Sequence, residues 1–449
     1  MIENYHGQTL LCRTTYENKE ITGRISFDPN SITIRLVGFE DFLYVRDNEE
    51  VHLQLENNRF CTVTPFWTSS GTHSTATYRS HYLDIEARQV ITGFRAWTHN
   101  DRVKDIHFGF SDTNRIFEAP DIRKKISACA IGEDPDTKII SASIGGVKIT
   151  VSYGLSRSWS DDRYLSSEPY GHIEFEEERA IGEVGEFLGM LHTFLSFSTG
   201  LAVRTKNYSL NAHENREVPM MGGGSVPERF YLTWPSKSLD QDKHHKYRRP
   251  TSVLRCFNEN DRKSTEECLI FWMKNWKKWK PAFHGLHLAT MEGSKFETNR
   301  IINACKWLDS TPGAQQEKVN DETELGKISN AAIKMAESLG LDIKDRLLGV
   351  ISCLRTESRN SLLQRLIEKA VKDPDSRKNI LKDIQKAYGI RGSFAHSKFY
   401  YTSDNDFGDY IRCTQAVEAL AFLLLYRELP LPSDHFWGHE ANFMSYFSY

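Results

Sequence analysis

The chain has 449 residues, more than a single hydrophobic core usually organises, so we expect two or three domains. Apolar residues make up 39% and charged residues 26%, which is typical of folded domains and excludes a wholly disordered chain. The 57 Lys and Arg nearly balance the 60 Asp and Glu, for a net charge of -3. A strongly basic nucleic-acid-binding chain is thereby excluded, and any contact with nucleic acid must come from a local basic patch.

The eight cysteines are scattered along the chain, with no C-x-x-C pair and no cluster that would indicate zinc. We therefore expect free thiols in a reducing cytosol, no metal and no cofactor. The N-terminus lacks the basic start and apolar run of a signal peptide. The longest apolar run, residues 421–426, is too short to cross a bilayer. These features predict a cytoplasmic protein with no membrane partner.

From about residue 8 to residue 178, short runs rich in Val, Ile, Thr, Phe and Tyr are separated by Asn, Asp, Gly and Pro. Several runs alternate apolar with polar residues, as half-buried antiparallel strands do. Their number and spacing favour a β-sandwich or jelly roll over βαβ units. The predicted strands are 21–27, 31–39, 51–56, 59–67, 91–97, 104–110 and 147–153.

The pattern changes after Gly182. Apolar residues at three- and four-residue intervals predict an amphipathic helix over 183–200. Residues 205–261 are polar and rich in Gly and Pro, so we expect a connecting segment with little core of its own.

Helical spacing dominates the rest of the chain, and Ser264 with Glu267 forms a capping-box pattern. The fold class is thus α+β, with a β-rich domain at 1–204, a connector at 205–261 and an all-helical bundle at 262–449. The predicted helices of the bundle are 264–279, 296–309, 322–339, 343–354, 359–372, 376–388 and 408–428.

The segment YGIRGSFAHSKFYY, residues 388–401, contains Arg391 and His396 in an R-x4-H arrangement near the expected start of a short helical segment. An arginine stays protonated and can donate two hydrogen bonds to a phosphate, and a histidine can transfer a proton near neutral pH. This pair suits metal-free cleavage of RNA, in which the ribose 2′-OH is the nucleophile. The spacing also fits a surface arginine beside a half-buried histidine, and Arg102 with His107 repeats it in the β-rich part.

Helix geometry limits how the pair can work, because residues five apart on a regular helix point about 140° away from each other. Either a helix begins inside the motif, which Gly389 and Gly392 would permit, or two protomers bring their motifs together. The long apolar last helix fits dimer contacts and equally fits plain bundle core.

The residues IRGSFAH between amphipathic helices resemble the signature of HEPN domains, the helical modules of many prokaryotic ribonucleases. The layout of the chain resembles that of ApeA-like antiphage proteins, which join a β-rich N-terminal domain to a C-terminal HEPN domain. The further residues that carry this resemblance are HIEFEEE at 172–178, FLGMLHTFLSFSTGLAV at 187–203, WKKWKPAF at 276–283, KFETNRIINACKWLDS at 295–310 and AVEALAFLLLYREL at 416–429.

The resemblance implies a metal-independent endoribonuclease that acts as a homodimer and cleaves RNA, tRNA or mRNA, to halt growth after phage infection. It implies that Arg391 orients the scissile phosphate and that His396 transfers the proton. It also implies that the front domain restrains the nuclease until a phage-derived protein triggers it. The position after the arginine is often polar in this family and here is Gly392, so the Ser393 hydroxyl is an auxiliary candidate. Gly392 keeps open a second hypothesis, a non-catalytic module that dimerises or binds RNA or protein.

Basic residues beside aromatic ones are candidates for RNA contact. In residues 272–280, Trp272, Trp276 and Trp279 form one helical stripe with lysines between them. The stripe fits either a core-facing surface with a solvated basic back or base stacking with phosphate neutralisation. The basic run 243–249 fits an RNA contact or a solvated loop. The candidate RNA-binding lysines are Lys277, Lys278, Lys280 and Lys398.

Other chemistries have little support, because neither a phosphate-binding glycine loop nor a serine-hydrolase motif occurs. His435 and His439 have metal-ligand spacing but no carboxylate or cysteine partner. Asp309, Glu292 and Glu418 lie on predicted helices and could be auxiliary active-site groups, but the sequence does not show how these helices pack.

Overall fold

The computed structural model divides into two compact units, residues 1–273 and 274–449. Among the described residues, no helix is both long and apolar enough to cross a membrane. All eight cysteines are free, and six of them are buried. The structure describes residues 5, 7–16, 19–28, 31–38, 49–74, 79–110, 116–157, 163–199, 203, 205–212, 217–219, 224–234, 254–292, 296–319, 321–395 and 404–431.

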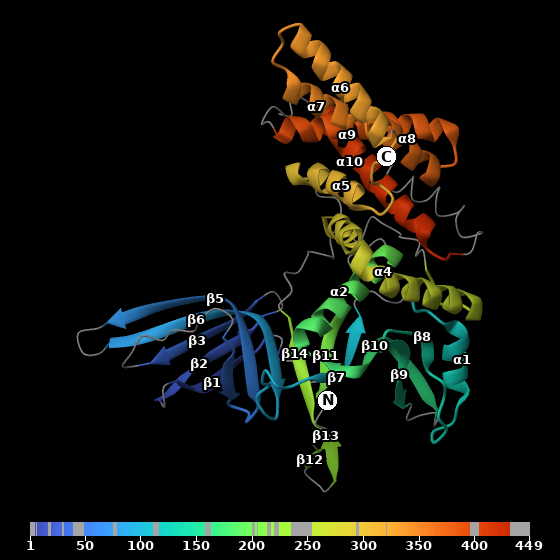
Figure 1. Ribbon diagram of the computed structural model, residues 1–449. Helices are drawn as coiled ribbons and strands as arrows, with labels where there is room; N and C mark the ends of the chain where they lie inside the picture. The colour runs from blue at the N-terminus through green and yellow to red at the C-terminus, as the bar shows by residue number, and fades with distance from the viewer. Residues whose placement is uncertain are drawn as a thin grey trace. The chain divides into compact units, whose positions relative to one another are not determined.

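The first six strands form a closed antiparallel sheet, drawn in blue in Figure 1. Their order is β3-β2-β1-β4-β5-β6, and pairing of β3 with β6 closes the sheet. Alternate residues point inward, as Ile32, Ile34 and Leu36 of β3 do, and these inward side chains form the core of the closed sheet. The strands are β1 (Thr9–Tyr16), β2 (Lys19–Phe27), β3 (Ile32–Gly38), β4 (Val51–Leu55), β5 (Phe60–Ser74) and β6 (Arg79–Gly93).

The last residues of β6 also pair with β14, so the sheet continues beyond its closed part. The continuation has the order β14-β11-β7-β10-β9-β8 and is antiparallel throughout. Its strands are β7 (Val103–Phe110), β8 (Lys138–Ile144), β9 (Val147–Arg157), β10 (Tyr164–Arg179), β11 (Thr205–Ala212) and β14 (Arg229–Thr233); β12 (Glu217–Pro219) and β13 (Ser225–Pro227) pair with each other.

One face of this open sheet is apolar and is covered by α2 (Ile181–Thr199). The Phe175 ring of β10 lies 5.5 Å from that of Phe187 on α2. Phe194 and Phe197, farther along α2, contact Trp272 of α4 (Glu259–Glu292) with ring centroids 5.6 and 5.4 Å apart. Because side chains alternate along a strand, the opposite face is left with the polar residues.

The α+β fold class predicted from the sequence is confirmed, while the arrangement of the strands differs from a sandwich or jelly roll. The strands form one continuous sheet because β6 pairs with β3 and β5 of the closed part and with β14 of the open part. Residues 205–261, expected to be a connector, contribute β11 and β14 to that sheet, and Leu210 and Phe230 are fully buried there.

The start of α4 also differs from the expected capping box. The helix begins at Glu259, and the side chain of Asn258 accepts a hydrogen bond from the backbone N–H of Asp261 at 3.0 Å. Asn258 is therefore the N-cap, and Ser264 lies inside the helix. A short helix earlier in the chain, α1 (Pro120–Ala128), is tied to α4 by an ion pair between Asp121 and Arg262 at 2.9 Å.

The second unit is helical, as predicted. Its last helix, α10, contacts α5, α8 and α9 and is buried almost continuously from Val417 to Tyr426. The predicted helices of this half all occur, although their ends shift; the largest shift is in α4, which was predicted to end at residue 279 and continues to Glu292. After α4 they are α5 (Thr298–Ser310), α6 (Glu322–Ser338), α7 (Lys344–Cys353), α8 (Arg359–Ala370), α9 (Pro374–Ala395) and α10 (Asp404–Glu428).

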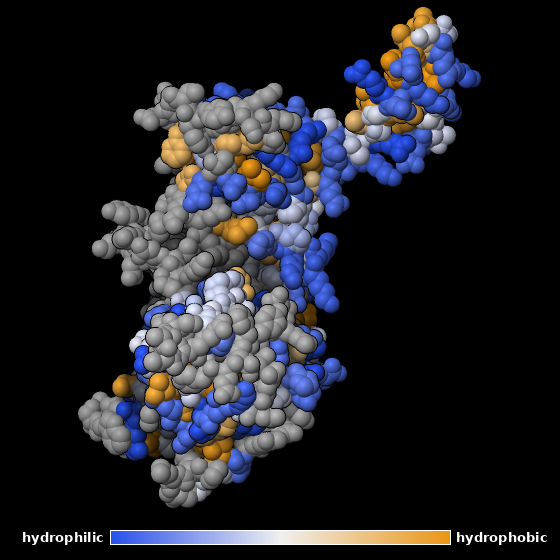
Figure 2. All heavy atoms as spheres, turned by 90° about the vertical axis from the view of Figure 1, so that its left-hand side faces the viewer, coloured by the Kyte–Doolittle hydropathy of each residue, from blue (hydrophilic) through white to orange (hydrophobic). Residues whose placement is uncertain are grey.

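Large apolar side chains are exposed on α6, α7 and the residues that join and follow them. Figure 2 shows them in orange over these helices, at the upper right. Each has more than 40% of its surface exposed, which is unusual for a contiguous set of this size. They are Ile328, Met335, Leu339, Leu341, Leu348, Val350 and Leu354.

Candidate functional site

The R-x4-H segment lies at the end of a helix. Arg391 and Ser393 are in the last turn of α9, which ends at Ala395. The prediction that the motif opens a helix is wrong, because α9 passes through Gly389 and Gly392 without a positive φ at either. His396 and Lys398 lie outside the described residues.

A carboxylate of α5 holds Arg391 in place. Arg391 Nη1 donates to Oδ2 of Asp309 at 2.8 Å. Oδ1 of the same carboxylate accepts from Arg359 Nη2 at 2.6 Å and from Tyr388 Oη at 2.8 Å. These four side chains, from α5, α8 and α9, form one hydrogen-bonded group that we call the Asp309 cluster. The exposed fractions of the Arg391, Asp309 and Arg359 side chains are 33%, 37% and 45%, so solvent reaches the cluster.

The Asp309 cluster carries an excess positive charge, because two guanidinium groups share one carboxylate. The Arg359 guanidinium also lies over the Tyr388 ring, 3.9 Å from its centroid, in a cation-π contact. Burial raises the pKa of the Tyr388 phenol, and the charge of Asp309 raises it further, so the phenol remains a hydrogen-bond donor. A solvent-accessible pair of arginines with fixed geometry can bind a phosphate group.

The thiol nearest to the cluster is inert. Cys305 is buried on α5, and burial raises the pKa of its thiol to about 12 although the charge of Arg391 opposes this. Nucleophilic attack requires the thiolate, so Cys305 is not a candidate nucleophile at neutral pH.

Ser393, the auxiliary candidate, is bonded within its own helix. Its Oγ donates to the carbonyl oxygen of Gly389 at 3.1 Å, the usual contact of a helical serine with the preceding turn. A Cβ at Gly392 would meet nothing within 4 Å, so packing does not exclude a polar side chain at that position.

The tryptophan stripe of α4 faces protein. Trp272 is fully buried and Trp279 is 3% exposed, while Trp276 stacks on Phe283 with ring centroids 5.5 Å apart. Base stacking on Trp272 and Trp279 is therefore excluded. Lysines beside the stripe are exposed, and their role as RNA contacts remains a prediction; they are Lys277, Lys278 and Lys280.

Within the described part of the chain, Asp309 is the acidic group that contacts the motif, through Arg391. Glu418 is instead buried on α10 in a double hydrogen bond with Arg300, at 2.8 and 2.9 Å. The side chain of Glu292, the basic run 243–249 and the pair His435 and His439 lie outside the described part of the chain.

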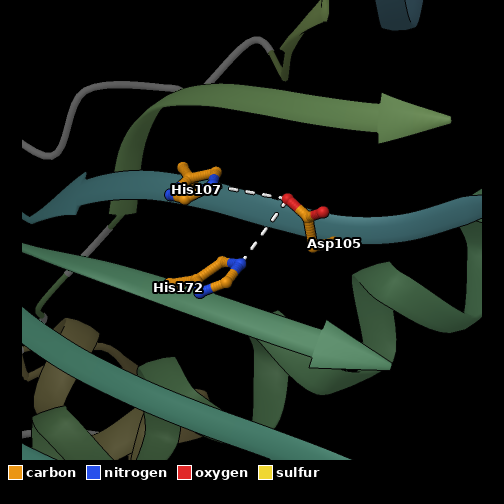
Figure 3. Close-up of side chains that lie close together, drawn as sticks. All are labelled: Asp105, His107 and His172. Atoms are coloured by element: carbon orange, nitrogen blue, oxygen red, sulfur yellow. Dashed lines mark ion pairs between the residues drawn. The ribbon is translucent and has the colours of Figure 1, made fainter. Parts of the chain in front are cut away.

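A second group of titratable side chains lies on the polar face of the open sheet (Figure 3). Asp105 and His107 point from β7, and His172 points from β10 directly opposite His107. Within the described ranges, this is the set of His, Cys, Asp and Glu whose spacing could hold a metal ion. Burial alone would raise the pKa of the Asp105 carboxyl, but the two histidines and Asn211 outweigh burial and lower it. Asp105 is thus an anion at neutral pH.

The second R-x4-H pair of the sequence does not act as a pair. Arg102 donates to the backbone carbonyls of His99 and Asp101 at 2.9 and 3.2 Å, whereas His107 turns toward Asp105.

Comparison with known proteins gives one match. Residues 5–272, more than half of the chain, match the family model described as ApeA N-terminal domain 1. The matched range nearly coincides with the first compact unit, which ends at residue 273. No curated protein and no solved structure matches the chain.

Proposed function

This chain belongs to the family defined by ApeA N-terminal domain 1, and from that premise we propose that its helical half is an antiphage endoribonuclease. The family membership supports a role in defence against phage. The enzyme would cleave RNA, either tRNA or mRNA, without the help of a metal ion. This cleavage would halt the growth of the infected cell. Arg391 and His396 would carry the reaction.

The observation that carries this proposal is the Asp309 cluster. Asp309 fixes the Arg391 guanidinium at the end of α9, a few residues before His396, and Arg359 supplies a second cation. Because one carboxylate neutralises only one of the two arginines, the cluster favours an anion such as the scissile phosphate. Asp309 is then a positioning residue, and Arg391 the group that touches the phosphate.

In the proposed reaction the ribose 2′-OH attacks the adjacent phosphorus and the 5′-oxygen leaves. His396 takes the proton from the 2′-OH or gives one to the 5′-oxygen, and Arg391 stabilises the charge of the phosphorane. The products are a 2′,3′-cyclic phosphate and a 5′-hydroxyl. Lys277, Lys278 and Lys280 would contact the RNA backbone, because all three are exposed on α4.

The experiment compares wild type, Arg391→Ala and His396→Ala at matched expression, for phage plating efficiency, host growth and RNA ends. Arg346→Ala is the control, because Arg346 is exposed on α7 and outside the cluster. We expect both motif variants to lose protection and cyclic-phosphate ends, with Arg346→Ala like wild type. Full protection and unchanged RNA ends in His396→Ala would overturn the assignment.

A second candidate function is a non-catalytic module that dimerises or binds RNA or protein. Two observations favour it: Gly392 supplies no side chain, and the Ser393 hydroxyl is bonded to its own helix. Growth on overexpression discriminates the two, since a nuclease is toxic and is detoxified by Arg391→Ala. A binding module would show the same growth with and without that substitution.

The remaining proposals concern regulation. We propose that the chain works as a homodimer in the cytoplasm and that its N-terminal domain restrains the nuclease until a phage-derived protein triggers it. A dimer would allow two motifs to share one cleft, which accommodates the position of Arg391 at the end of a helix.

A further inference from the structure

We propose that Asp105, His107 and His172 bind a divalent transition metal ion, with Zn²⁺ as the ion that fits best. Two imidazoles and one carboxylate are a donor set that zinc uses in proteins, usually with water as a fourth ligand. The site lies in the N-terminal domain, and it is independent of the proposed nuclease in the helical half.

The strand pairing brings the three ligands together. Asp105 and His107 are two residues apart on β7, so both point to the same face of the sheet. His172 is the direct cross-strand partner of His107 in the antiparallel pair of β7 with β10. Side chains at such positions lie close together without any movement of the backbone.

The distances fit a tetrahedral ion. Oδ1 of Asp105 lies 3.3 Å from Nε2 of His107 and 3.5 Å from Nε2 of His172. Two ligands about 2.0 Å from a tetrahedral zinc are about 3.3 Å from each other. Ligands at right angles around a six-coordinate ion with bonds of about 2.1 Å would be about 3.0 Å apart. All three donor atoms lie within 4.8 Å of one another, and rotation of the two imidazole rings about their side-chain bonds would direct both Nε2 lone pairs at one ion.

Hydrogen bonding alone leaves one of these donors unsatisfied. Nε2 of His172 is buried and has no hydrogen-bond partner among the described residues, and its ion pair with Asp105 Oδ1 is long, at 3.5 Å. The two imidazole rings are stacked, with centroids 4.1 Å apart and planes 6° from parallel, and both present Nε2 to the same carboxylate oxygen. A buried polar nitrogen without a partner is costly, and a metal ion between the three donors removes that cost.

The surroundings hold the carboxylate in place and leave room for a further ligand. Asn211 of β11 donates its Nδ2 to Oδ1 of Asp105 at 2.9 Å, the kind of outer contact that orients metal-binding carboxylates. His107 also lines an open pocket of about 530 Å³, whose wall includes Lys206, Arg229 and Tyr231. Bound metal would tie β7 to β10 beside this pocket.

The test uses the full chain, freed of metal with a chelator and titrated with Zn²⁺ in competition with a chromogenic indicator. His172→Gln and Asp105→Asn remove one ligand each. His52→Gln is the matched control, because His52 is an outward-facing strand histidine of β4 whose ring Nδ1 lies 3.1 Å from the Thr62 hydroxyl. Circular dichroism of each metal-free variant checks that it is folded.

We expect one Zn²⁺ per chain in wild type and in His52→Gln, with affinity lower by about tenfold or more in the two ligand variants. Zn²⁺ should also raise the melting temperature of wild type and not that of His172→Gln. Equal affinity in wild type and His172→Gln, or no zinc bound by wild type, would overturn the proposal.

Cobalt provides a measurement on the wild type alone. Co²⁺ in a tetrahedral site of nitrogen and oxygen ligands gives visible d-d bands without a thiolate charge-transfer band. We expect this spectrum. A spectrum with the thiolate band would place the ion on a cysteine, such as the exposed Cys353, and would also overturn the proposal.

Discussion

Arg300 and Glu418 are an ion pair enclosed by the helical unit, with 5% and 2% of their side chains exposed. Two hydrogen bonds join them, and the Arg300 guanidinium also lies 4.1 Å from the centroid of the Phe296 ring. Such a pair adds little to the stability of the fold compared with apolar residues of the same volume. Removal of one partner, however, leaves the other as an unpaired buried charge.

We therefore expect Glu418→Ala to lower the free energy of unfolding by about 3–5 kcal/mol. The double variant Arg300→Met with Glu418→Leu should recover more than half of that loss. Urea unfolding followed by circular dichroism measures both.

The exposed pair of Lys369 and Glu428 serves as control, with 49% and 37% of the side chains exposed. Glu428→Ala should cost less than about 1 kcal/mol. Equal losses in the free energy of unfolding for Glu418→Ala and Glu428→Ala would show that burial of the ion pair does not determine the cost of breaking it.

At the scale of single residues, the sequence predicted Arg391 as a site residue and named Asp309 without placing it. No sequence pattern identified Arg359 or Tyr388 as site residues, because only the packing of α8 and α9 on the end of α5 brings them to Asp309. The sequence also did not predict the proposed zinc site. Asp105 and His107 lie within a predicted strand, but His172 is 65 residues after His107. The register of its strand, β10, against β7 cannot be read from composition.

At the scale of elements, α4 and α5 approach closely at Gly285. A Cβ there would lie 2.4–2.6 Å from atoms of Trp307, which is itself 2% exposed and cannot move aside. We expect Gly285→Ala to destabilise the protein by about 1–3 kcal/mol, because the two helices would have to separate.

Gly326 on α6 provides the control for that substitution. A Cβ at Gly326 meets nothing within 4 Å, so Gly326→Ala should stabilise the protein by about 0.5–1 kcal/mol through the higher helix propensity of alanine. Thermal unfolding of both variants tests the pair, and a stabilising Gly285→Ala would contradict the close contact.

Helices were easier to predict than strands. Each helix of the second unit carries a clear apolar period, so its existence followed from the sequence. β11 and β14 escaped prediction because they lie in a polar, glycine-rich stretch and each is at most eight residues long. Their place between β6 and β7 depends on pairings with residues about 95 to 143 positions away.

At the scale of the whole molecule, the proposed restraint of the nuclease by the N-terminal domain can be tested by removing that domain. A chain of residues 274–449 contains the second unit with the Asp309 cluster. We expect it to slow growth more than the full chain at matched amounts on an immunoblot, and Arg391→Ala should abolish the difference. If the truncated and full chains slow growth equally, the N-terminal domain is not the restraint.

Because β6 pairs in both the closed and the open part of the sheet, the order in which the chain is synthesised affects its folding. Val90, Ile91 and Thr92 pair with β5 on one side and with β14 on the other, although β14 follows some 140 residues later. A ribosome that synthesises the N-terminal end first must release residue 233 before this edge of β6 can be covered. Until then the nascent chain exposes an open strand edge, the kind of surface that invites pairing with other chains. Folding of the N-terminal domain is thus completed by one of its last segments to be translated.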